Sequence, residues 1–160
     1  MEHGSTVRGR VSRAVARGTA TRNVADPGRW AVESENEGEI WILVPPEARY
    51  LRALRLVTAE AGGRAGLSVS EVDDLRIAVD ELCQVLMDST DHRLAVRIAV
   101  HGRSLVIRAT ARRKSSGPAP RLSSVSELIV DAVADHYDLE HSPSEASFVL
   151  SKTAGRLTVQ

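Results

Sequence analysis

The sequence predicts an α+β fold, a two-layer sandwich with helices on one face of a mixed, mostly antiparallel sheet. Strand-like and helix-like segments follow the order strand, helix, helix, strand, strand, helix, strand, strand. This order lacks the strand–helix–strand alternation that builds parallel sheets. A short link around Gly102 joins two segments with alternating apolar residues, which is typical of an antiparallel hairpin.

The first strand is predicted at residues 39–44, which are rich in β-formers and are followed by two prolines. Residues 46–62 carry apolar side chains at helical spacing and end at two glycines, which predicts a helix. A second helix, running to about Ser89, is predicted from Ser68 and Glu71, whose spacing matches a capping box. Its apolar stripe, the expected core contact, comprises Val72, Leu75, Val79, Leu82, Cys83 and Leu86.

The second half of the chain is predicted to hold four strands and one helix. Alternation and composition predict the strands, and helical spacing of apolar residues predicts the helix. In chain order we expect strands at 93–101 and 104–111, a loop at 112–121, a helix at 122–136, and strands at 137–140 and 146–153.

The chain is long enough for one domain with a sizeable core, and its hydrophobic fraction of 42% fits a globular protein. We expect a flexible N-terminal arm at residues 1–37, a folded domain at 38–154 and a tail at 155–160. The arm begins with arginines among small residues: Arg8, Arg10, Arg13, Arg17, Arg22 and Arg29. It is interpreted either as a disordered tail or as a basic segment that touches nucleic acid or an acidic partner.

Charge and cysteine content exclude several classes of protein. The formal net charge is zero, which argues against a domain built to bind nucleic acid. Cys83 is the only cysteine, so an intramolecular disulfide is impossible and a cysteine-based zinc site is not expected. The five histidines include no pair at i, i+4 spacing, so no metal site is predicted. No apolar run reaches the length of a membrane span, and no signal-peptide core precedes the domain, so we expect a soluble cytoplasmic protein without a membrane partner.

Two features suggest surfaces for a protein partner. Arg49, Arg52 and Leu56 share one face of the first predicted helix, and arginine is enriched in protein interfaces. The alternative interpretation is a solvated face with a single outward leucine. The predicted strand at 39–44 offers a sheet edge that a second copy of the chain can extend, giving a homodimer.

The second predicted helix also carries a carboxylate on the side away from its apolar stripe. Glu81 lies there, with Ile77 and Val85 four residues to either side. An apolar pair bracketing a carboxylate indicates partial cover by a cleft or a lid. The alternative is a surface glutamate between two exposed apolar residues.

Residues 74–87 read Asp-Leu-Arg-Ile-Ala-Val-Asp-Glu-Leu-Cys-Gln-Val-Leu-Met. This segment resembles the "DLRLAVDEACTNAL" segment of serine-kinase anti-sigma factors of the RsbW and SpoIIAB type, especially its actinobacterial variants. The resemblance covers roughly residues 38–153. It implies the histidine-kinase-like ATPase (GHKL) fold, a sigma factor or a STAS-domain antagonist as partner, and a homodimer.

The resemblance implies that Glu81 occupies the position of the general base, where it would also contact nucleotide. The Mg²⁺-binding asparagine of active relatives corresponds to Val85, which has no oxygen to offer a hard cation. The adenine-recognising Asp-x-Gly-x-Gly box should fall near residues 111–117, which contain no aspartate. The glycine-rich lid corresponds to residues 120–124, which contain no glycine.

These three departures predict that the chain is not an effective enzyme and needs no cofactor. The expected function is that of an anti-sigma-like regulator that binds its partners without useful ATP hydrolysis. The alternative is a divergent ATP-dependent serine/threonine kinase with Glu81 as base, in which Gln84 or Asp88 would replace the missing Mg²⁺ ligand. Neither residue lies directly in the place of the asparagine.

Overall fold

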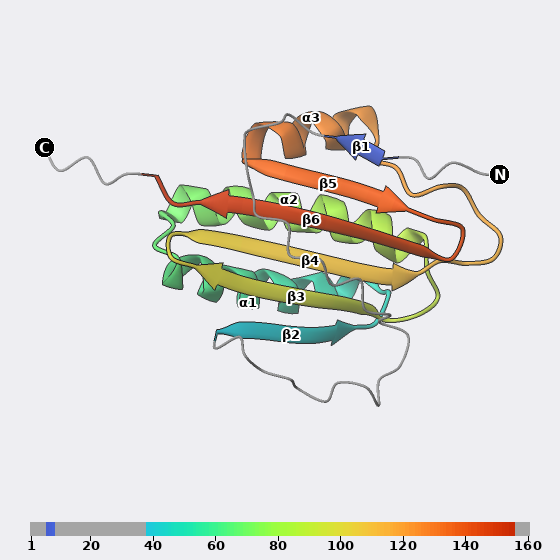
Figure 1. Cartoon of the computed structure of the whole chain (residues 1–160), viewed down its shortest axis with the longest axis horizontal. Coiled ribbons are helices and arrows are strands. Elements are labelled where there is room, and N and C mark those ends of the chain that lie inside the picture. Colours follow the sequence, from blue (N-terminus) through green and yellow to red (C-terminus); the bar gives the residue numbers. More distant parts are fainter. Residues whose placement is uncertain (1–5, 9–37, 156–160) are drawn as a thin grey trace, which may run out of the picture.

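The computed structural model describes residues 6–8 and 38–155 of the chain. The described strands form one six-stranded sheet in the order β1-β5-β6-β4-β3-β2, and every neighbouring pair is antiparallel. Helices α1 and α2 lie behind this sheet and α3 flanks it near β5 (Figure 1). The predicted two-layer α+β class is therefore confirmed.

The elements follow the predicted order. They are β1 (Thr6–Arg8), β2 (Glu39–Val44), a 3-10 turn (Ala48–Tyr50), α1 (Leu51–Arg64), α2 (Val69–Asp88), β3 (Leu94–His101), β4 (Ser104–Arg112), α3 (Ser124–Val133), β5 (His136–His141) and β6 (Glu145–Thr153). Strand β1 is an addition to the prediction, because it lies within the segment expected to be an arm. The rest of that arm, and residues 156–160 of the tail, lie outside the described residues.

The sequence analysis expected the first helix to stop at its two glycines, but the helix continues beyond them. Helix α1 continues through Gly62 and Gly63 to Arg64. A β-carbon at Gly62 would lie only 3.2 Å from the side chains of Leu67 and Val72, so this glycine permits close packing against the start of α2. Two residues after the end of α1, Gly66 has a φ of +79°, which allows Leu67 N–H to bond the Gly62 carbonyl.

The third helix is shorter than predicted and gives way earlier to a strand. Helix α3 starts after Ser123, whose hydroxyl accepts the N–H of Ser126 at 3.0 Å. It stops at Val133 because Ala134 is already extended, with φ −95° and ψ 146°. This early end allows His136 to open β5 opposite Ser151 of β6.

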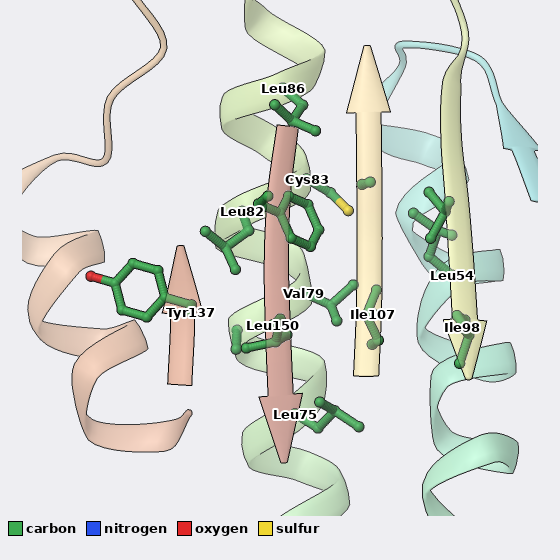
Figure 2. Close-up of a cluster of buried hydrophobic side chains, with 14 of the residues drawn as sticks. Leu54, Leu75, Val79, Leu82, Cys83, Leu86, Ile98, Ile107, Tyr137 and Leu150 are labelled. Carbon is green, nitrogen blue, oxygen red and sulfur yellow. The ribbon is translucent and has the colours of Figure 1, made fainter. Parts of the chain in front are cut away.

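The core lies between the sheet and α2, the central helix of the layer. The predicted stripe of α2 is buried at Leu75, Val79, Leu82, Cys83 and Leu86. Figure 2 shows these side chains next to the strands that carry Ile107 and Leu150, whereas Leu54 of α1 lies next to the strand that carries Ile98. The capping box at the start of α2 is also confirmed, since Ser68 and Glu71 bond each other's backbone N–H groups at 3.3 and 2.7 Å.

Candidate functional site

Helix α2 carries three acidic residues in the segment that resembles the family, and two of them serve the packing of the domain. Asp80 binds Arg55 of α1, and Asp74 lies 3.5 Å from the Nζ of Lys152 on β6. Glu81 is part-buried and is left out of both ion pairs. Among the residues that the structure describes, the carboxylate that the sequence analysis singled out is therefore the one of the three without an ion-pair partner.

The residues one turn after Glu81 do not provide a metal site. Val85 packs against the hydrophobic core. The Gln84 amide donates to the Asp88 carboxylate at 2.8 Å, so the two proposed substitute ligands bind each other. Within the described ranges 6–8 and 38–155, no group of three histidine, cysteine or acidic residues is placed to hold a metal ion.

The loop that should carry the adenine-binding box is fastened to the end of α2 by basic residues. Lys114 donates its backbone N–H to the Ser89 carbonyl at 3.0 Å, and its ammonium group lies 3.2 Å from Asp91. Arg113 donates from its guanidinium to the Ser142 carbonyl at 2.6 Å. These contacts hold cations in the region where the family pattern places an aspartate.

An open pocket of about 260 Å³ lies between this loop and the end of α2. Its lining comprises Asp88, Ser89, Arg113, Lys114, Ser116, Gly117 and Pro118. Glu81 is not part of the lining. The cavity and the candidate base therefore do not form one site in this structure.

The predicted partner surface on the first helix is exposed. Leu56 is 61% exposed, and Arg49 and Arg52 are exposed near it in sequence. Arg49 also pairs with Glu47 at 2.8 Å and lies 5.0 Å above the ring of Tyr50. Arg52 and Leu56 are thus the members of this trio that have the fewest contacts of their own.

The predicted sheet edge at 39–44 is also found, because β2 is the last strand on its side of the described sheet. Ile40, Ile42 and Val44 pack toward the helices, whereas Trp41 and Leu43 are largely exposed on the opposite face. The Arg97 guanidinium lies 5.3 Å from the Trp41 ring and donates from Nε to Glu39 at 2.7 Å.

The sequence analysis missed two exposed apolar residues on α3. Leu128 is 71% exposed, and Val125 is also exposed. The signal was available for α3, because its segment is apolar on more than one face. A helix that is apolar on more than one face normally packs against a second element.

Cys83 is confirmed as a core residue. Its side chain is fully buried, and burial followed by the charge of Asp80 raises the pKa of its thiol strongly. Such a thiol is a poor nucleophile. Of the described helices, none has the length and apolar character that a membrane crossing requires.

Comparison with known proteins identifies the fold. No protein-family model and no curated protein matches the chain. Among solved structures, it is similar to the crystal structure of the RsbU and RsbW domains of Rv1364c from Mycobacterium tuberculosis, at 16% identity and a TM-score of 0.55. The match covers 76% of this chain and 35% of that one, so the chain spans about a third of that structure's length. The chain therefore has an RsbW-like fold.

Proposed function

We propose that this chain is a cytoplasmic regulatory domain that acts by binding proteins, namely a sigma factor, a STAS-domain antagonist, or both in exchange. The proposal includes the absence of effective ATP hydrolysis and kinase activity. It is supported by the RsbW-like fold and by the segment at 74–87 that resembles anti-sigma factors.

The observation that carries the proposal is the environment of Val85. An active relative would need an oxygen ligand for Mg²⁺ at this position, one turn after the base. Here an apolar side chain packs against the core instead, while Gln84 and Asp88 bond each other. Phosphoryl transfer depends on metal stabilisation of phosphate charge, and this arrangement offers no replacement for it.

Isothermal titration calorimetry with ATP and Mg²⁺ tests the enzymatic half of the proposal. We expect no metal-dependent heat at micromolar nucleotide concentrations. Micromolar, Mg²⁺-dependent binding would instead favour the divergent serine/threonine kinase, with Glu81 as its base. The Glu81→Gln variant then decides the matter, because it should abolish phosphorylation of an antagonist only if the kinase exists.

The binding half is tested by co-purification from the native host, followed by mass spectrometry. We propose that Arg52 and Leu56 contact the partner, since both are exposed and close together on α1. Retention of a sigma factor or a STAS-domain protein by the wild type, and its loss in Arg52→Ala/Leu56→Ala, is the expected result. Arg64→Ala, at the far end of the same helix, is the matched control and should retain the partner.

We also propose that two copies of the chain associate through β2. The strand is at the sheet edge, and its Trp41 and Leu43 lie on the face away from the helices. In the register of β2 with β3, Ile42 pairs with Val96 and the N–H of Leu43 points away from β3, so sedimentation of the wild type and of Leu43→Pro tests this. Proline removes an edge N–H and should yield monomers, whereas a wild type that sediments as a monomer excludes the dimer.

A further inference from the structure

The face of the sheet that points away from the helices, its open face, is unusually apolar. Antiparallel sheets with one packed face normally carry polar side chains on the other. In β2, β3, β4 and β6 the residues of the helix-side core alternate with residues that point outward. In Figure 1 the open face is turned toward the reader, with α1 and α2 behind the sheet. Six of the outward residues are apolar, and they come from all four strands: Trp41, Leu43, Ala95, Ala99, Val106 and Val149.

These apolar residues are only partly covered by their neighbours within the sheet. Leu43 of β2 is 38% exposed, and Val106 and Val149 are half-buried although neither belongs to the helix-side core. The register places Val106 between Ala99 of β3 and Ser151 of β6, whose short side chains give it little cover. A segment lying flat on β3, β4 and β6 would therefore bury apolar surface, which stabilises the contact.

The topology of the sheet requires one segment of the chain to cross the domain. Strand β1 ends at Arg8 on one edge of the sheet, and β2 begins at Glu39 on the opposite edge. Five strand spacings of about 4.8 Å separate the two edges, which gives about 24 Å. Residues 9–37, which lie outside the described residues, join these edges and are several times longer than that distance when extended. They pass either over the helices or over the open face.

The order of charges fits a path across the open face. On that face β5 carries Asp138 and Glu140, and Arg8 at the end of β1 pairs in register with Asp138. The segment that follows Arg8 is basic, since residues 9–25 contain four arginines and no acidic residue. Its other end is acidic, since residues 30–37 contain three glutamates and no basic residue. That end leads into β2, two strands from the exposed Arg108 of β4.

We propose that residues 9–37 lie across the open face of the sheet, where Trp30 covers Val106 and Val149. Trp30 precedes β2 by nine residues, which reach about 30 Å when extended, whereas β6 is three strand spacings, about 14 Å, from β2. The occupant is the chain's own segment because attachment at both edges of the sheet gives it a high effective concentration at this face. This inference does not depend on the proposed sigma factor or STAS-domain partners.

Cross-linking between engineered cysteines in the full chain tests the path. Ala31→Cys places one thiol beside Trp30, and Ser151→Cys places the other on the open face, in the register row that contains Val106. The native Cys83 is fully buried, so a short bis-maleimide should leave it unmodified. We expect a cross-link within one chain, identified by its mobility in a denaturing gel and by peptide mass spectrometry.

Ala31→Cys combined with Gly63→Cys is the matched control on the helix side. Gly63 is exposed in the last turn of α1, and a β-carbon there has no atom within 4 Å. This end of α1 lies at the same end of the domain as the start of β2 (Figure 1), so the tether is of similar length. The Ala31/Ser151 pair should cross-link at least about fivefold faster than the control pair.

Two outcomes of this experiment would overturn the proposal. Equal rates, or a faster reaction of the control pair, would show that the segment does not reside on the open face. Products that join two chains at Ser151→Cys would show that a second copy covers the face instead.

The contact of Trp30 is tested separately by thermal unfolding of the full chain. Trp30→Ala should lower the thermal midpoint by about 3 °C or more, because apolar surface is exposed on both sides of the contact. The shift should shrink in the Val149→Ser background, where the contact is already weakened. Arg29→Ala, a change at the adjacent residue, is the control and should shift the midpoint by less than about 1 °C. No shift with Trp30→Ala, or an undiminished shift in Val149→Ser, would refute the assigned contact.

Discussion

The guanidinium of Arg55 on α1 donates from Nε to both carboxylate oxygens of Asp80 on α2, at 2.9 and 2.6 Å. This hydrogen bond, with the charge of Asp80, raises the pKa of Arg55. The pair joins the first two helices on the side away from the sheet. It also explains why the first acidic residue of the Asp80-Glu81 doublet is not available to a ligand.

The Arg55–Asp80 pair should contribute modestly to stability because both side chains are partly exposed. A double-mutant cycle with Arg55→Ala and Asp80→Ala is expected to give a coupling free energy of about 0.5–1 kcal/mol from urea unfolding. The same cycle on Arg64 and Glu60, which are 4.0 Å apart and more exposed, should give a smaller value. If the coupling free energy of Arg55 and Asp80 is no larger than that of the control pair, the ion pair does not stabilise the contact between α1 and α2.

Lys152 should contribute more to stability than the Arg55–Asp80 pair does, since its side chain is nearly buried between α2 and α3. Its Nζ donates to the Val133 carbonyl at 2.7 Å and lies 3.5 Å from Asp74 and 3.6 Å from Asp135. Lys152→Met is expected to lower the free energy of unfolding by about 1.5–3 kcal/mol, because the last carbonyl of α3 and two carboxylates lose their cation.

Lys114→Met is the control for this substitution. Lys114 also has an acidic partner, Asp91, but that carboxylate is mostly exposed. Its loss should cost less than about 1 kcal/mol in the same denaturation experiment. Comparable losses for the two lysines would show that the buried position of Lys152 has no special effect.

Glu71 should make the domain sensitive to acid. Hydrogen bonds from the backbone N–H groups of Ser68 and Gly155 lower the pKa of Glu71 from 4.5 to about 2. A carboxyl with a lowered folded pKa contributes stability above its unfolded pKa, and that contribution declines as the pH falls from about 4.5 toward 2.

Thermal midpoints measured from pH 7 to pH 2 test this expectation. Wild type should be more stable than Glu71→Gln at pH 6, and the difference should shrink as the pH approaches 2. Glu60→Gln, which changes an exposed residue of α1, should follow the wild-type profile. A constant difference between wild type and Glu71→Gln at every pH would contradict the assigned hydrogen bonds.

Cys83 should serve as a probe of global unfolding. Its thiol is fully buried and its pKa is raised, so it is both inaccessible and protonated near neutral pH. We expect a thiol reagent to react at least about 100-fold more slowly with native protein than with urea-unfolded protein. Fast labelling of the native chain would mean that α2 opens away from the sheet.

Local patterns in the sequence were sufficient for the type and order of the elements from residue 39 onward. Alternating apolar residues marked β3 and β4, and the Ser68–Glu71 box marked the start of α2. These signals act between residues a few positions apart, so they can be read from a single chain. The ends of α1 and α3 were predicted less well, because packing at Gly62 and pairing of β5 with β6 decided them.

What is known of the candidate site also divides into features that the sequence determined and features that only the tertiary structure decided. The sequence by itself determined that Glu81 lies away from the apolar stripe of its helix, that Val85 offers no metal ligand and that Arg52 and Leu56 share a helix face. Only the tertiary structure decided that Asp74 and Asp80 are occupied by Lys152 and Arg55. Such contacts join residues on different elements, and their distances follow from how the helices pack on the sheet, which no short-range spacing encodes.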